Sequence, residues 1–289
     1  RILYEKKISM IRWYKLKKRK KKLKYKNIIL LIITTLLLII SIFIFYKSLK
    51  LKITNNKNQK IHNKTVIKKE NKKQPEQLNK VTYKDGFYYE DLSEKVKEKI
   101  TGCSFPKSFD ERYSKISYDD LKYVKVKYYN FDNEIKEGEI IINKLVAQDV
   151  VEIFYKLFEE KYQIEKMNLV EEYNCDDELS MEDNNTSAFN YRILEEETDL
   201  SWHAFGLAID INPLYNPYVY GNEIYPKTAT KYKDRTLNIK GMITRNDTIY
   251  KIFKEYGWSW GGDFNNTKDY QHFFKEGVLD RSIRERKDN

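Results

Sequence analysis

One long apolar run and several shorter periodic ones divide this chain. Residues 28–46 read IILLIITTLLLIISIFIFY, nineteen positions without a charge. At about 1.5 Å per residue, such a helix spans the roughly 30 Å hydrocarbon core of a bilayer. A buried core helix is seldom so uniformly apolar, and a signal peptide has a shorter run that ends in small residues. The run therefore predicts a retained transmembrane anchor.

Patterns after residue 80 predict the elements of a folded domain. Apolar residues at helical spacing favour helices over 90–100, 146–162 and 247–256. Alternating or β-branched stretches favour strands over 121–129, 137–142, 166–173, 187–191, 206–211 and 272–274. Helices early, strands late and short connections indicate an α+β fold, with an antiparallel sheet flanked by helices behind the N-terminal transmembrane helix.

Charge is distributed unevenly along the chain. Residues 1–80 carry 24 Lys and Arg against 3 Asp and Glu, and the remainder carries 30 against 40. The basic cluster KLKKRKKKLKYK precedes the apolar run, so the positive-inside rule places 1–27 in the cytoplasm. Residues 47–80 are rich in Lys, Asn and Gln and predict a flexible linker. Residues 81–289 then form an extracytoplasmic domain of a single-pass protein of the cell membrane.

The acidic character of the folded part argues against nucleic acid as a partner. A nucleic-acid-binding protein carries its positive charge on the folded domain, whereas here it lies on the membrane-flanking segments. The expected partners are the membrane, reached through the single N-terminal helix, and a substrate outside it.

Cys103 and Cys175 are the two cysteines of the chain. An exported domain permits a disulfide, which here would close a long loop and contribute roughly 4 kcal/mol in the chain-entropy model. Two free thiols are an equal alternative. Neither cysteine has the C-x-x-C spacing of a metal or redox site.

Two short runs in the last third hold the candidate chemistry. SWHAFGLAIDIN contains His203 and Asp210, and KDYQHFF contains Asp269 and His272, although the chain has only three histidines. Imidazole and carboxylate bind zinc well, and three such ligands leave a position for water while a further carboxylate accepts its proton. Gly206 permits a tight turn at His203 that leads into a strand. Each residue alone is explained by a cap or a surface position, and the pairing of the runs is what favours a zinc hydrolase.

The same runs resemble a known family. SWHAFGLAID resembles the S-x-H-x-x-G-x-A-x-D motif of the VanY-type D-alanyl-D-alanine carboxypeptidase and L-alanyl-D-glutamate peptidase family, which are bacterial cell-wall zinc peptidases. WGGDF (260–264) with DYQHF (269–273) is similar to the second block of that family, and NNTSAFNYR (184–192) and DINPLYNPY (210–218) also resemble it. The resemblance covers the domain after about residue 100 and nothing of the anchor.

The resemblance implies a role for each residue of the two runs. Zn²⁺ would be held by His203, Asp210 and His272, on the antiparallel sheet. Asp269 would be the catalytic base.

The resemblance also suggests roles for two further residues. Arg192 would polarise the scissile carbonyl and stabilise the oxyanion, which suits an always-charged guanidinium, and a surface ion pair is its alternative. Ser201 either hydrogen-bonds the substrate or caps a turn.

The expected function is that of a membrane-anchored zinc metallopeptidase that acts on peptidoglycan stem peptides. D-alanyl-D-alanine carboxypeptidase activity is favoured, because 184–192 and 210–218 look closer to that branch. The alternatives are an L-alanyl-D-glutamate endopeptidase, a non-catalytic, zinc-containing module that binds the cell wall, and a structural anchor protein whose acidic domain contacts a partner. Asp269 favours an enzyme, since a module without catalysis has little need of it.

Overall fold

The computed structural model describes residues 78–194, 199–237, 239–285 and 287. The predicted cytoplasmic segment, the predicted anchor and most of the predicted linker lie outside these residues. Within the described part of the chain, no helix combines the length and the apolar character needed to cross a bilayer. The first strand begins at Lys80, the last residue of the predicted linker.

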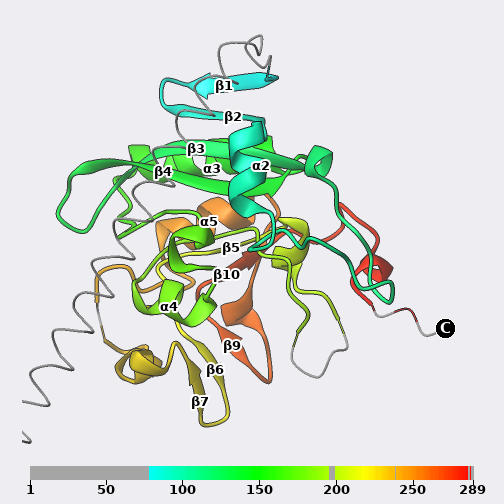
Figure 1. The fold of residues 1–289 in the computed structure, drawn as a ribbon. Helices are drawn as coiled ribbons and strands as arrows, with labels where there is room; N and C mark the ends of the chain where they lie inside the picture. Colours follow the sequence, from blue (N-terminus) through cyan, green and yellow to red (C-terminus); the bar gives the residue numbers. More distant parts are fainter. Residues whose placement is uncertain (1–77, 195–198, 238, 286, 288–289) are drawn as a thin grey trace, which may run out of the picture. The chain divides into compact units, whose positions relative to one another are not determined.

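A four-stranded antiparallel sheet forms the first half of the described domain (Figure 1). Its strands, in spatial order, are β1 (Lys80–Lys84), β2 (Phe87–Asp91), β3 (Leu121–Tyr129) and β4 (Ile135–Asn143). Helix α2 (Glu94–Ile100) follows β2 and is capped by the side chain of Ser93, and α3 (Ala147–Glu159) follows β4. Burial alternates along β3, and its buried side chains share one core with Val150, Phe154 and Leu157 of α3.

The second half consists of two small antiparallel sheets with short helices around them. One sheet has the order β5 (Ala208–Asp210), β10 (His272–Phe274), β8 (Ser259–Trp260), and the other has the order β7 (Glu223–Tyr225), β6 (Tyr218–Tyr220), β9 (Lys268–Asp269). The α-helices are α4 (Asp177–Glu182) and α5 (Thr248–Glu255). In Figure 1, β5 and β10 lie between the four-stranded sheet and the β6–β7 hairpin, so the small sheets extend the domain away from the large one.

The mixed α and β architecture with antiparallel sheets is confirmed, and so are several of its elements. The strands predicted over 121–129, 137–142, 206–211 and 272–274 and the helices predicted over 146–162 and 247–256 are present, with shorter or shifted ends. The predicted order of helices first and strands late is wrong, because β1 to β4 occupy the first half. The predicted helix over 90–100 begins only at Glu94, since β2 continues to Asp91.

Two predicted strands are absent from the described residues. Over 166–173 the backbone makes a single bridge at Lys166 and then forms a 3₁₀-helix, Val170–Tyr173. Over 187–191 the N–H groups of Ser187, Phe189 and Tyr191 donate to three separate segments, so no ladder with one neighbour forms. Both stretches contribute apolar side chains to the core, Met167 and Leu169 from the first and Ala188 and Phe189 from the second, and periodicity alone does not separate that case from a strand.

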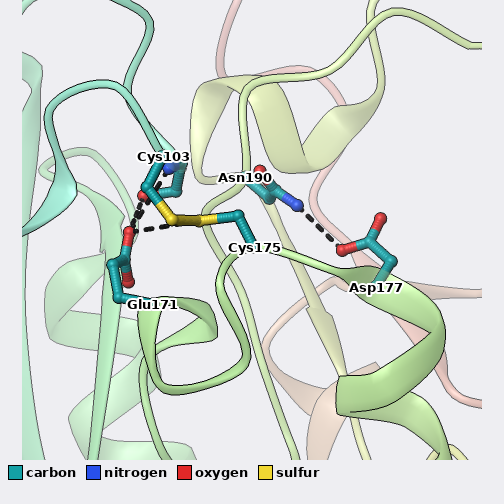
Figure 2. Close-up of a disulfide and its surroundings, with 6 residues drawn as sticks. Cys103, Glu171, Cys175, Asp177 and Asn190 are labelled. Atoms are coloured by element: carbon teal, nitrogen blue, oxygen red, sulfur yellow. Dashed lines mark hydrogen bonds between the residues drawn. A yellow bond between two sulfur atoms is a disulfide. The ribbon is translucent and has the colours of Figure 1, made fainter. Parts of the chain in front are cut away.

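A disulfide joins Cys103 to Cys175, with 5.6 Å between the Cα atoms. Figure 2 shows Glu171 on one side of the disulfide and, on the other, Asn190, which donates to Asp177 at 2.8 Å. Glu171 accepts hydrogen bonds from Ser104. The bond ties the loop after α2 to Cys175, the residue before Asp176, which is the N-cap of α4. Of the two alternatives left open by the sequence, the structure has the paired form.

Candidate active site

A short helical turn and a strand position His203 and Asp210. The 3₁₀-helix Trp202–Phe205 carries His203, and its cap is Ser201, whose side chain accepts the His203 N–H at 3.3 Å. The turn ends at Gly206 in the left-handed conformation, with φ +62°, and β5 then leads to Asp210. The predicted sequence of turn and strand is therefore confirmed.

Gly206 is required at this turn for two reasons. Its positive φ is unfavourable for a residue with a side chain. A Cβ atom there would also lie 2.7 Å from the backbone nitrogen of Asn143, at the end of β4. The close approach of these backbones brings the turn that carries His203 against the large sheet.

Strand pairing brings the second run to the first. His272 lies directly opposite Asp210 in the β5–β10 ladder. Asp269 ends β9, where it pairs with Tyr218 of β6. Four residues from two runs almost sixty positions apart thus meet at one edge of the small sheets.

The two other stretches that resemble the family bind each other around β5. Ser187 and Asp210 exchange backbone hydrogen bonds of 3.1 and 2.9 Å. Two backbone N–H groups of 210–218 then donate to side chains of 184–192: Asn212 to Thr186 Oγ1 at 3.2 Å and Leu214 to Asn184 Oδ1 at 2.9 Å. These bonds explain the polar residues in the two stretches, because they fix the strand that presents Asp210.

Three donor atoms converge at the end of β5. His203 Nε2 lies 3.1 Å from His272 Nδ1 and 3.3 Å from Asp210 Oδ2, and His272 Nδ1 lies 3.0 Å from Asp210 Oδ1. All three residues are buried, and one ligand atom from each lies within 4.8 Å of the other two. His203 Nδ1 faces the carbonyl of Ala188 at 2.5 Å, which assigns the ring proton to Nδ1 and leaves the Nε2 lone pair directed at the cluster.

This donor set fits zinc. Two imidazole nitrogens and one carboxylate oxygen are ligands of catalytic zinc sites, in which the protein supplies three ligands. The carbonyl behind His203 is the usual second partner of a metal-ligating histidine, and it fixes the orientation of the ring. The assignment of the three residues as zinc ligands stays a prediction, and the spacing of their ligand atoms is compatible with it.

Burial and mutual charge set the protonation of the cluster. Burial acts to raise the pKa of Asp210, but the facing imidazoles of His203 and His272 outweigh it and hold that pKa below its ordinary value. Burial acts to lower the pKa of His203, and the Asp210 carboxylate reverses this and raises it. The cluster thus keeps an ionised carboxylate between two rings.

Asp269 is in the opposite situation. Burial is the main effect and raises the pKa of Asp269 to about 6, with the nearby Asp210 carboxylate adding to the rise and His272 acting against it. Its Oδ1 atom is buried and has no hydrogen-bond partner among the described residues. A carboxyl group with a pKa near neutrality beside a candidate metal site is suited to proton transfer.

Arg192 both forms an ion pair and reaches the site. Its Nε lies 2.9 Å from Asp177 Oδ2, at the start of α4, and Asp177 in turn accepts the Asn190 amide. The guanidinium also lines the cavity that contains the cluster. The ion pair named as its alternative is therefore present, and it holds the charge at the cavity wall.

The cluster opens into a cavity of about 850 Å³. Besides the predicted residues and Tyr218, which ends the family-like stretch 210–218, it is lined by groups that sequence reasoning missed, namely Asp176, Asp177, Glu178 and Met181 around α4, Tyr225 of β7, Gln271, Glu276 and Arg284. Among these, only Gln271 stands inside one of the two runs of candidate chemistry. The others come from segments whose sequence carries no sign of the site.

Comparison with known proteins agrees with the resemblance. Residues 195–275 match the model of a family described as D-alanyl-D-alanine carboxypeptidase. The matched segment includes His203, Asp210, Asp269 and His272, and it begins after Arg192. No curated protein and no solved structure matches the chain. The resemblance to this family is thus confirmed for the segment that carries both runs.

Replacing Gly206 tests how the site is positioned. We expect Gly206→Ala to lower the free energy of unfolding by at least about 2 kcal/mol, because the left-handed turn and the contact with β4 both oppose a side chain. Gly221 is the matched control: its φ is +57°, and a Cβ there meets nothing within 4 Å. Gly221→Ala should cost about 1 kcal/mol, for conformation alone. Equal losses in urea denaturation would contradict the close approach.

Metal analysis tests the cluster. We expect the purified full-length chain to bind one zinc ion, lost on chelation, because three buried donors leave one open position. His203→Ala should reduce the zinc affinity at least about tenfold. His62→Ala is the control, since it removes the remaining histidine from the predicted linker. Elemental analysis and competition with a chromogenic chelator measure both, and equal zinc retention in the two variants would contradict the assignment.

Proposed function

We propose that this chain is a membrane-anchored zinc peptidase that acts on peptidoglycan stem peptides. Its residues 195–275 match the model of a family described as D-alanyl-D-alanine carboxypeptidase. The match itself supports a peptidase. The finer assignment, D-alanyl-D-alanine carboxypeptidase, is favoured because it is the activity by which the matching family is described. The observation that carries the proposal is the meeting of His203, Asp210 and His272 beside the buried carboxyl of Asp269.

The residues would divide the chemistry between them. His203, Asp210 and His272 would hold the zinc ion, which would act as a Lewis acid and make hydroxide available near pH 7. Asp269 accepts the proton of the attacking water and then delivers it to the nitrogen of the leaving amine. Its buried oxygen, which has no hydrogen-bond partner among the described residues, supports that role.

Arg192 would stabilise the charge that develops on the scissile carbonyl oxygen. A guanidinium remains charged throughout and offers a planar set of donors to an oxyanion. The Asp177 carboxylate holds the Arg192 Nε, which leaves the terminal nitrogens of the fork as the ends nearest a substrate. Asn190, which donates to the other oxygen of Asp177, fixes the carboxylate in turn.

Peptide cleavage by the full-length chain tests the proposal. Incubated with muropeptides, the wild-type chain should release a terminal D-Ala, and Asp269→Ala should reduce the rate by about 10²- to 10⁴-fold while retaining zinc. Mass spectrometry identifies the bond. Cleavage between L-Ala and D-Glu would replace the carboxypeptidase assignment with the endopeptidase. If the zinc-bound chain releases no product from any stem peptide, the enzyme assignment fails and the non-catalytic module is favoured.

The pH dependence of the rate follows from Asp269. Asp269 accepts a proton only when ionised, and burial raises its pKa to about 6 in the metal-free protein. A bound cation lowers this pKa, so kcat/KM should fall tenfold per unit of pH below a midpoint at or under about 6. Stopped assays between about pH 4 and 8, with zinc content checked at each pH, measure the profile. A rate that rises as the pH falls would contradict a basic role.

A further inference from the structure

Two oxygen atoms on the cavity wall are buried without a hydrogen-bond partner among the described residues. One is Oδ1 of Asp269, and the other is Oε1 of Gln271, whose side chain is only 4% exposed. A buried acceptor without a partner lowers stability and requires an explanation. The proposed mechanism accounts for Asp269 and gives Gln271 no role.

The contacts of Gln271 determine which end of its amide is available. Its Nε2 lies 3.6 Å from the sulfur of Met181, on α4, and a thioether accepts but does not donate. The backbone carbonyl of Gln271 accepts the Ile211 N–H at 3.0 Å, which fixes the residue beside β5. Because the amide nitrogen faces Met181, the carbonyl oxygen is the end left for a donor that enters the cavity.

We propose that Gln271 Oε1 accepts a hydrogen bond from a backbone N–H of the substrate peptide. The inference rests on the proposed peptidase function and adds a substrate-recognition residue to it. A neutral acceptor beside the thioether of Met181 favours a neutral donor, since a buried ammonium group requires a carboxylate partner.

The proposed chemistry determines which N–H is free for this contact. Asp269, two residues before Gln271, delivers its proton to the scissile nitrogen. The other flanking N–H belongs to the residue whose carbonyl is attacked, and the chemistry does not consume it. Gln271 therefore holds the acyl-side residue by its N–H, and a substrate without that N–H is discriminated against.

Two peptides that differ in this one group test the inference. The probes are N-acetyl-L-Lys-D-Ala-D-Ala and its analogue with D-lactate in place of the first D-Ala, which replaces the N–H by an ester oxygen and keeps the scissile amide. The wild-type full-length chain should release D-Ala from the amide probe about tenfold faster in kcat/KM than from the ester probe. Gln271→Met, of similar size and without the acceptor, should act on both equally.

Controls separate this effect from a general loss of structure. Gln148→Met makes the same substitution on α3, where the Gln148 amide pairs with Glu152 instead of lining the cavity, and it should keep the wild-type preference. Zinc content and the midpoint of thermal unfolding are measured for each variant. An amide-to-ester ratio that Gln271→Met leaves unchanged overturns the inference.

A binding experiment on a variant that lacks the proposed catalytic base, Asp269, distinguishes this inference from the proposed function. The Asp269→Asn chain, titrated calorimetrically with each probe, should bind the amide about tenfold more tightly than the ester, and adding Gln271→Met should remove the difference. If that pattern holds while the wild-type chain cleaves neither probe, the inference stands and the carboxypeptidase assignment fails. If the amide probe does not bind, the inference is overturned.

Discussion

The pairing of β5 with β10 is the constraint on which the site depends. It sets Asp210 opposite His272, from runs far apart in the sequence, and no side-chain attraction between them could do so reliably. Because side chains alternate along a strand, a slip of one residue would turn His272 away from Asp210. The backbone exchange between Ser187 and Asp210 braces β5 from its other edge, so the strand has little freedom to shift.

The residues around this pairing are polar for structural reasons as much as chemical ones. The buried Asn212 Oδ1 accepts the Glu165 N–H, and its amide donates to the carbonyl of Gln163, so one side chain closes the turn after β5. Asn216 and Arg235 continue the network through the next turn. Satisfied buried networks of this kind favour one arrangement over its alternatives. This network fixes the backbone around His203, Asp210 and His272 and so helps to hold their ligand atoms close together.

The candidate site was more accessible to sequence reasoning than the fold. The motif spacing of His203, Gly206 and Asp210 reflects a local turn and strand, and local geometry is what a short pattern encodes. Most of the cavity wall could not be predicted, because residues such as Asp177 and Tyr225 reach it only through tertiary packing. The failed strands at 166–173 and 187–191 have the same cause. Their backbones hydrogen-bond to several neighbouring segments in turn. The hydrophobic pattern indicates that a segment is buried, but it does not indicate which segment its backbone pairs with.

The disulfide gives the cavity wall a dependence on chemical environment. Cys175 stands two residues before Asp177, so the covalent bond that holds Cys103 also anchors the carboxylate that steadies Arg192. Until the two thiols are oxidised, that anchor is missing and α4 is held by weaker contacts alone. A chain whose two thiols stayed reduced would thus lack the covalent bond that holds the α4 side of the cavity. Formation of the disulfide would then also complete this side of the cavity, so an oxidising environment would favour the arrangement in which Asp177 holds Arg192.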